Sequence, residues 1–105
     1  IDGVLAGTVT LHLATPQNQA HRADVAKLLV DPAFRRHGLA ARLMARMEDA
    51  ARAAGRSLLT LDTQTGDAGE ALYRHLGWQE AGRIPGYARH ASGSLIDTVL
   101  FWKTL

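Results

Sequence analysis

The segment that most constrains the fold of this chain is a short basic turn with one glycine, Arg-Arg-His-Gly-Leu-Ala at residues 35–40. An apolar stretch that ends in Asp31-Pro32 precedes the turn, and an amphipathic stretch begins at Gly38. These segments predict a strand, a tight turn and a helix. The first backbone N–H groups of a helix have no partner within the helix, and the helix dipole places partial positive charge there. The segment therefore predicts an anion-binding site that would suit a pyrophosphate.

Individual residue types in the turn fit that prediction. Gly38 allows the backbone to approach a ligand closely, and the two arginines add full positive charges. The turn is not a Walker A loop, because no Lys-Ser/Thr pair follows the glycine, and one glycine is too few for a dinucleotide fingerprint. Taken alone, the pattern is also typical of a solvated basic loop in front of a helix.

The remainder of the chain supplies strands on both sides of this segment. Alternating or continuous apolar residues bounded by Gly, Pro and polar turns are the signals for strands. They predict strands over residues 4–13, 23–30, 57–63, 79–84 and 95–103. With the two helices described next, the predicted order is ββαβαββ.

Two helices are predicted from apolar residues at spacings of three and four. The first covers residues 38–54 and ends before Gly55, with an apolar stripe formed by Leu39, Leu43, Met47, Ala50 and Ala54. The second follows Asp67, which with Glu70 forms a predicted capping box. Its inward positions are predicted to be Leu72 and Leu76.

Composition excludes several classes of function. The chain has 105 residues, a length that suits one domain. Its 12 basic and 10 acidic residues give no strong field, so neither nucleic acid nor an anionic membrane is predicted as a partner. No cysteine is present, and the five histidines show no metal-ligand spacing, so no metal site is predicted. No apolar run approaches the roughly 20 residues of a membrane span, and we expect a cytoplasmic protein.

Two motifs in this order resemble those of the GNAT superfamily of N-acetyltransferases. Arg35-x-x-Gly38-x-Ala40 matches all three fixed positions of the family's pyrophosphate loop, Arg/Gln-x-x-Gly-x-Gly/Ala. Tyr73, four residues ahead of Gly77-Trp78, matches a later family motif at a helix end. The resemblance implies an α/β fold with a mixed sheet, in which residues 1–105 form a single domain equivalent to the C-terminal two thirds of a GNAT domain.

Further segments resemble the tabtoxin-resistance acetyltransferases within that family. They are residues 21–30, 58–63, 85–87 and 101–105. The resemblance implies that acetyl-CoA is the co-substrate and that the acceptor is the amine of a small molecule, such as a toxin, an antibiotic or an amino-acid-like compound. A homodimer is included among the expected partners.

The resemblance also implies roles for individual residues. The cofactor's pyrophosphate would lie on the turn formed by Arg35, Arg36, His37, Gly38, Leu39 and Ala40. Leu29 and Val30 would offer main-chain groups to the pantetheine arm, and a backbone N–H near Leu29 would suit the thioester oxygen as it gains charge. Tyr87 would contact substrate from a late loop or, alternatively, cover the sheet.

Acid and base roles are implied for one tyrosine and two aspartates. Tyr73 would be the general acid, because a phenol with a pKa of about 10 is protonated at neutral pH and can donate to a thiolate. Its alternative role is packing, although its offset from the predicted inward positions of its helix suggests that it need not face the core. Asp24 and Asp62 are alternatives for the general base, and each is otherwise a hydrogen-bonded carboxylate in a strand.

A second function stays open beside direct acetyl transfer in a ternary complex, namely a GNAT-like module that binds acyl-CoA without catalysis. The resemblance further implies that a first strand and two helices precede residue 1 in the natural protein. We therefore expect about 50–70 additional N-terminal residues, judged from usual domain sizes. We also expect that residues 1–105 by themselves are poorly stable or self-associate, since an exposed strand edge invites intermolecular pairing.

Overall fold

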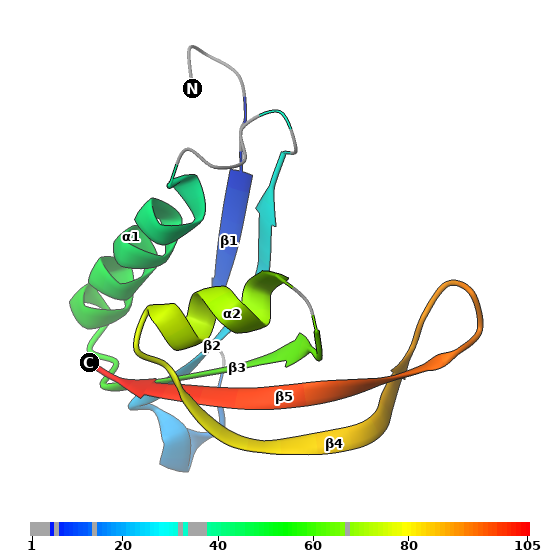
Figure 1. Ribbon diagram of the computed structural model, residues 1–105. Coiled ribbons are helices and arrows are strands. Elements are labelled where there is room, and N and C mark those ends of the chain that lie inside the picture. Colours follow the sequence, from blue (N-terminus) through cyan, green and yellow to red (C-terminus); the bar gives the residue numbers. More distant parts are fainter. Residues whose placement is uncertain (1–4, 6, 14, 32, 34–37, 67) are drawn as a thin grey trace. The chain divides into compact units, whose positions relative to one another are not determined.

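A computed structural model describes residues 5, 7–13, 15–31, 33, 38–66 and 68–105 of the chain (Figure 1). The predicted order ββαβαββ is confirmed, with a 3-10 turn at Gln17–Gln19 as the one addition within the described residues. The elements are β1 (Gly7–His12), β2 (Arg22–Val30), α1 (Leu39–Ala53), β3 (Leu58–Gln64), α2 (Ala68–His75), β4 (Gln79–Arg89) and β5 (Leu95–Thr104). The chain divides into two compact units, residues 1–59 with residue 105, and residues 60–104.

In the first unit, β1 and β2 form an antiparallel pair with an irregular register. Thr8 lies opposite Leu29 and Thr10 lies opposite Ala26, so two steps along β1 correspond to three along β2. An extra residue on one strand is a β-bulge, which takes that residue's backbone groups out of the regular ladder. The bulge therefore falls directly before the end of β2.

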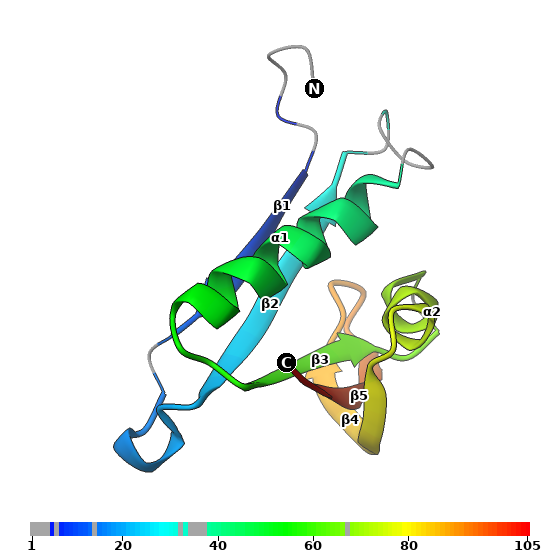
Figure 2. The same cartoon turned by 90° about the vertical axis from the view of Figure 1, so that its left-hand side faces the viewer.

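Helix α1 lies along β1 and β2 and covers them on one side (Figure 2). Its buried residues are Met44, Met47 and Ala51. The predicted stripe was wrong at its C-terminal end, because Ala50 and Ala54 are exposed. A helix that packs on a pair of strands buries the residues nearest the strands. Because alanines occur on all sides of α1, the sequence did not show which of them face the strands.

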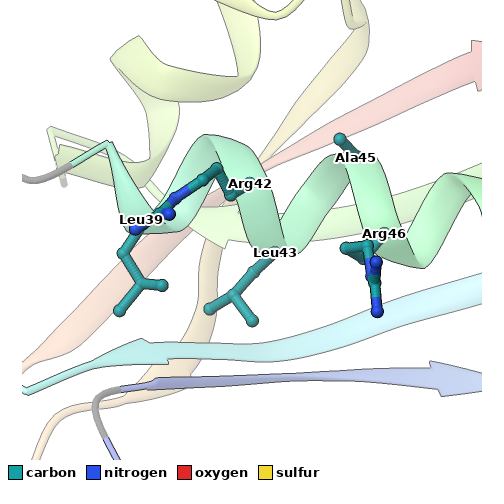
Figure 3. A pocket seen from close by; sticks show the side chains of 5 residues that line it. All are labelled: Leu39, Arg42, Leu43, Ala45 and Arg46. Carbon is teal, nitrogen blue, oxygen red and sulfur yellow. The ribbon is translucent and has the colours of Figure 1, made fainter. Parts of the chain in front are cut away.

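Gly7 of β1 allows α1 to pack closely on the strands. A Cβ atom at this position would lie 2.7 Å from the Leu29 carbonyl oxygen, 3.1 Å from Cδ1 of Leu43 and 3.4 Å from Cδ2 of Leu39. Figure 3 shows both leucines pointing from α1 toward the strands. The absence of a side chain at residue 7 is thus a packing requirement of the first unit.

The second unit is built around an aromatic cluster. Its strands lie in the order β3, β5, β4, and β4 and β5 are antiparallel. The Tyr73 ring of α2 lies 6.0 Å from the Trp78 ring and 5.9 Å from the Phe101 ring of β5. Aromatic pairs in edge-on or tilted geometry at these separations add to the stabilisation from burial.

Strands β4 and β5 form a long twisted hairpin (Figure 1). The predicted boundary of the fourth strand at residue 84 was wrong, since β4 continues to Arg89. The segment Pro85-Gly86-Tyr87, predicted as a loop, lies within this strand at an interruption of the register between Ile84 and Ala88. Pro and Gly ended the predicted strand too early, because both residues are also compatible with a bulge.

A network of ion pairs joins α2 to β4. Glu70 accepts hydrogen bonds from the Gly66 N–H at 2.8 Å, from Arg74 at 3.1 Å and from Arg83 at 2.9 Å. Arg74 also pairs with Glu80 at 2.6 Å. The Gly66 N–H, followed by Arg74, holds the pKa of the Glu70 carboxyl below its usual value. The predicted capping box of Asp67 with Glu70 cannot be followed, because Asp67 lies outside the described residues; the amide that Glu70 binds is that of Gly66.

Candidate functional site

Helix α1 begins at a glycine in the left-handed conformation. Gly38 has φ 67° and ψ 16°, and its carbonyl accepts the Arg42 N–H at 3.1 Å. No described atom lies within 4 Å of a Cβ placed at this residue, and the first turn of α1 holds no acidic residue. The predicted loop residues Arg35, Arg36 and His37 lie outside the described residues. Among the described residues the helix start is thus open, its first turn carries no acidic side chain, and its backbone conformation favours glycine.

A hollow of about 480 Å³ lies beside the first turns of α1. Figure 3 shows the side chains that line it, Leu39, Arg42, Leu43, Ala45 and Arg46. Leu39 and Ala40, both predicted in the pyrophosphate loop, form the first turn of the helix and are half-buried. The hollow therefore combines leucine side chains with two exposed guanidinium groups close to the helix start.

The end of β2 carries the two residues predicted to contact the pantetheine arm. Leu29 lies opposite Thr8 and Val30 opposite Gly7, immediately after the bulge of β2. Leu29 is 63% exposed, which is unusual for a leucine in a strand with a packed helix nearby. The first unit thus brings together an exposed strand end and the open start of α1 within one compact part of the chain.

Tyr73 is buried, with 8% of its surface exposed. Its offset from Leu72 and Leu76 suggested that it need not face the core, but the ring is part of the core and packs against Trp78 and Phe101. A Cβ placed at Gly69 would lie 3.8 Å from Cζ of Tyr73 and 3.3 Å from Oγ1 of Thr63. The ring carbon that bears the hydroxyl therefore lies near Gly69 in the first turn of α2.

The two candidate bases differ in their surroundings. Asp24 of β2 forms an ion pair with Arg22, and 47% of its side chain is exposed. Asp62 of β3 is exposed and follows the buried Leu61. Asp24 belongs to the first unit and Asp62 to the second. Both carboxylates are accessible, so both stay candidates.

Tyr87 lies in the bulge of β4 and is 55% exposed. The preceding Gly86 has φ 61° and donates its N–H to Oδ1 of Asp97 at 2.8 Å. Asp97 was not among the residues predicted from the sequence. The signal that could have found this bulge is the Pro-Gly pair inside an otherwise strand-like segment, since isolated Gly and Pro in strands mark bulges.

No group of three or more His, Cys, Asp or Glu side chains in the described part of the chain could hold a metal ion. None of the helices formed by the described residues is long and apolar enough to cross a membrane.

Comparison with known proteins relates this architecture to one enzyme family. The model of the acetyltransferase (GNAT) family matches residues 1–78, a segment that contains both the 35–40 turn and Tyr73. An uncharacterized N-acetyltransferase in the hisH-hisA intergenic region of Azospirillum brasilense is 42% identical over 66 residues. These residues make up 61% of this chain and 39% of that protein.

Solved structures share the fold over the whole length of this chain. An acetyltransferase of the GNAT family from Streptococcus pneumoniae superposes with a TM-score of 0.90 at 25% identity, covering 100% of this chain and 63% of that one. The yncA protein of Salmonella typhimurium, solved with acetyl-CoA, gives a TM-score of 0.88 at 20% identity and is covered to 61%. The chain thus spans less than two thirds of the length of these relatives. With a family model that matches most of its residues, the chain belongs to the GNAT acetyltransferase family.

Proposed function

We propose that this protein transfers an acetyl group from acetyl-CoA to the amine of a small molecule, directly and within a ternary complex. The observation that carries the proposal is the open start of α1 at Gly38, in a chain whose family model spans the turn and Tyr73. The acetyl-CoA in the yncA structure supports the choice of co-substrate. The acceptor proposed here is a toxin, an antibiotic or an amino-acid-like amine.

In this proposal the backbone at the start of α1 binds the pyrophosphate. A left-handed glycine lets the chain enter the helix without a side chain over the first free N–H groups, which then point at the anion. The exposed end of β2 at Leu29 and Val30 would pair with the amides of the pantetheine arm, as a strand edge pairs with a peptide. The predicted arginines of the turn would add positive charge to the same anion site, and His37 would add a hydrogen-bond donor.

The chemical step needs a proton donor for the departing thiolate. The amine nitrogen forms a bond to the thioester carbonyl carbon, the carbon–sulfur bond breaks, and the hydroxyl of Tyr73 gives its proton to the sulfur. A phenol suits this role because its ordinary pKa of about 10 leaves the proton available at neutral pH. Its ring packs against Trp78 and Phe101, which restricts the movement of the ring that carries the hydroxyl. The amine's own proton would leave through Asp24 or Asp62, directly or through water.

Coenzyme A binding tests the cofactor half of the proposal. Gly38→Asp adds a carboxylate at the helix start, and we expect its Kd for coenzyme A, measured by calorimetry, to rise at least about tenfold, or about 1.4 kcal/mol. The matched control is Gly55→Asp, because Gly55 also has positive φ, at 76°, and open space around its Cα, but lies at the other end of α1. Equal affinities for Gly38→Asp and wild type would show that the anion site has been wrongly assigned.

Removal of one hydroxyl tests the catalytic half. Tyr73→Phe keeps the ring contacts with Trp78 and Phe101, so we expect the variant to fold and its KM for acetyl-CoA to be unchanged. The expected loss in kcat is about 10²–10⁴-fold, the usual contribution of a general acid. Thiol release with a panel of amines provides the assay. An unchanged kcat would reduce Tyr73 to a packing residue, and tight coenzyme A binding without thiol release for any amine would favour the non-catalytic module.

A further inference from the structure

The bulge of β4 displaces a short backbone segment from the sheet. Ile84 lies opposite Thr98 and Ala88 lies opposite Ile96, so four steps along β4 correspond to two along β5. Residues 85–87 of β4 therefore share a single opposite residue, Asp97. Backbone groups in such a bulge leave the regular ladder and need other partners.

Asp97 supplies a partner for this bulge and connects it to β3. Its Oδ1 accepts the Gly86 N–H at 2.8 Å, and its main-chain carbonyl accepts the Thr65 N–H at 3.2 Å. The adjacent Thr98, which is 4% exposed, donates its hydroxyl to the Thr63 carbonyl at 3.0 Å. A hydrogen bond to an ionised carboxylate is stronger than one between neutral groups. One short segment of β5 thus holds both the end of β3 and the displaced backbone of β4.

Exposed apolar side chains lie next to this attachment. Leu95 is 60% exposed, and its Cδ1 would lie 3.4 Å from a Cβ at Gly86. Alternate residues of a strand share a face, so Leu95 and Asp97 lie on the same face of β5 as Phe101, which contacts Tyr73. At about 3.3 Å per residue, Asp97 lies about 13 Å along β5 from Phe101. The face of β5 that packs on Tyr73, the proposed proton donor, thus continues to the exposed Leu95. A small molecule is long enough to reach from one to the other.

We propose that Asp97 is a positioning residue that determines which amines the enzyme accepts, by holding the Gly86–Tyr87 backbone beside Leu95. The inference rests on the proposed function and extends it to the acceptor, which is a small amine with an apolar body lying on Leu95 and Tyr87. Asp97 itself does not touch the reacting atoms. Its carboxylate fixes the bulge, and the bulge fixes Tyr87.

Amide hydrogen exchange measured by NMR on the full chain tests the positioning step independently of activity. In Asp97→Ala, exchange at the Gly86 amide should accelerate at least about tenfold, because the acceptor is lost. Asp97→Asn retains a side-chain oxygen and should restore most of the protection. Asp49→Ala, which removes an exposed carboxylate on α1 that pairs with Arg52 at 3.3 Å, is the matched control and should leave Gly86 unchanged. Unchanged exchange at Gly86 in Asp97→Ala would overturn the proposal.

Steady-state kinetics with a panel of amines tests the selectivity step. For Asp97→Ala we expect acceptor KM values to rise about tenfold for apolar amines and their ranking to change, with KM for acetyl-CoA within about twofold of wild type. Gly86 is the other partner of the hydrogen bond, and its φ of 61° makes Gly86→Ala strained. This variant should therefore change the same ranking of acceptors. If Asp97→Ala showed faster exchange at the Gly86 amide but the same ranking of acceptor amines as wild type, the proposed role of Asp97 in selectivity would be overturned. If the wild-type protein transferred acetyl to no amine, the proposed function itself would fail and the selectivity role with it, while the exchange data would still decide whether Asp97 holds the bulge.

Discussion

Substitution of Gly7 by alanine is the most direct test of how α1 packs on β1 and β2. The added methyl would lie 2.7 Å from the backbone carbonyl oxygen of Leu29, closer than side-chain carbons approach such atoms. It would also lie 3.1 Å from Cδ1 of Leu43, a side chain that can rotate away. The carbonyl cannot move without shifting β2 at the exposed end that is proposed to bind the pantetheine arm. The substitution thus perturbs packing and the proposed site together.

Two opposing effects set the magnitude. Extra atoms in a well-packed region typically cost about 1–3 kcal/mol. Replacement of glycine by alanine also reduces the conformational entropy of the unfolded chain, which stabilises the folded state by about 0.4–1 kcal/mol where the backbone is compatible. We therefore expect Gly7→Ala to lower the free energy of unfolding by about 1–2 kcal/mol, equivalent to about 4–16 °C in Tm for a domain of this size.

Urea denaturation followed by circular dichroism measures this difference. The matched control is Gly82→Ala in β4, where no described atom lies within 4 Å of the new methyl group. That variant should be as stable as wild type or up to about 1 kcal/mol more stable. In the Gly7→Ala background, Leu43→Ala should relieve the side-chain contact but not the carbonyl contact. If Gly7→Ala proved as stable as Gly82→Ala, the close approach of α1 to the strands would be refuted.

Two further predictions concern the second unit. Trp78 is 5% exposed, and its Nε1 has no hydrogen-bond partner among the described residues. Trp78→Phe should lose ring contacts, but it also removes a buried unsatisfied donor, which costs the folded state about 1–3 kcal/mol. The free energy of unfolding of Trp78→Phe should stay within about 1 kcal/mol of wild type, whereas Phe101→Ala should lose about 3–5 kcal/mol. A loss in Trp78→Phe as large as that in Phe101→Ala would contradict the assignment of Nε1 as an unsatisfied donor. The pKa of Glu70 in the folded state lies below the ordinary value of 4.5. The ionised carboxylate therefore stabilises the fold at pH values above 4.5, and this stabilisation is lost as the pH falls through the folded-state pKa. The Tm difference between wild type and Glu70→Gln should therefore shrink between pH 7 and pH values below 4.5, and a constant difference would exclude this linkage.

Local signals predicted the order of the elements and both ends of α1. Gly38 and Gly55 flank the 15-residue helix with positive φ, as expected for glycines at its boundaries. The buried face was predicted correctly at Met47 but not at Ala50 and Ala54, which are exposed. Such signals act within a few residues and depend little on the remainder of the chain. The end of β4 was predicted less well, because Pro85 and Gly86 are typical of loops but lie inside this strand.

The candidate site was predictable in its residue types but not in its surroundings. The sequence identified Tyr73 from its spacing to Gly77-Trp78, yet it did not show that the ring is buried between Trp78 and Phe101. Phe101 follows Tyr73 by 28 positions, and its approach depends on how α2 lies on β5. For the same reason the role of Asp97 could not be predicted, because its partner Gly86 lies 11 residues away on another strand.

Local signals were therefore sufficient to predict the order of the elements, the glycine at the start of α1 and the family to which the motifs point. These features follow from interactions between residues close together in the chain, or from short motifs that keep their spacing. The folded structure was needed to show that Tyr73 is part of the core, that Gly7 is required for helix packing, and that Asp97 holds the bulge beside Tyr87. Each of these depends on atoms brought into contact across strands, and contacts of that kind arise from the register and packing of distant segments, which a local pattern does not encode.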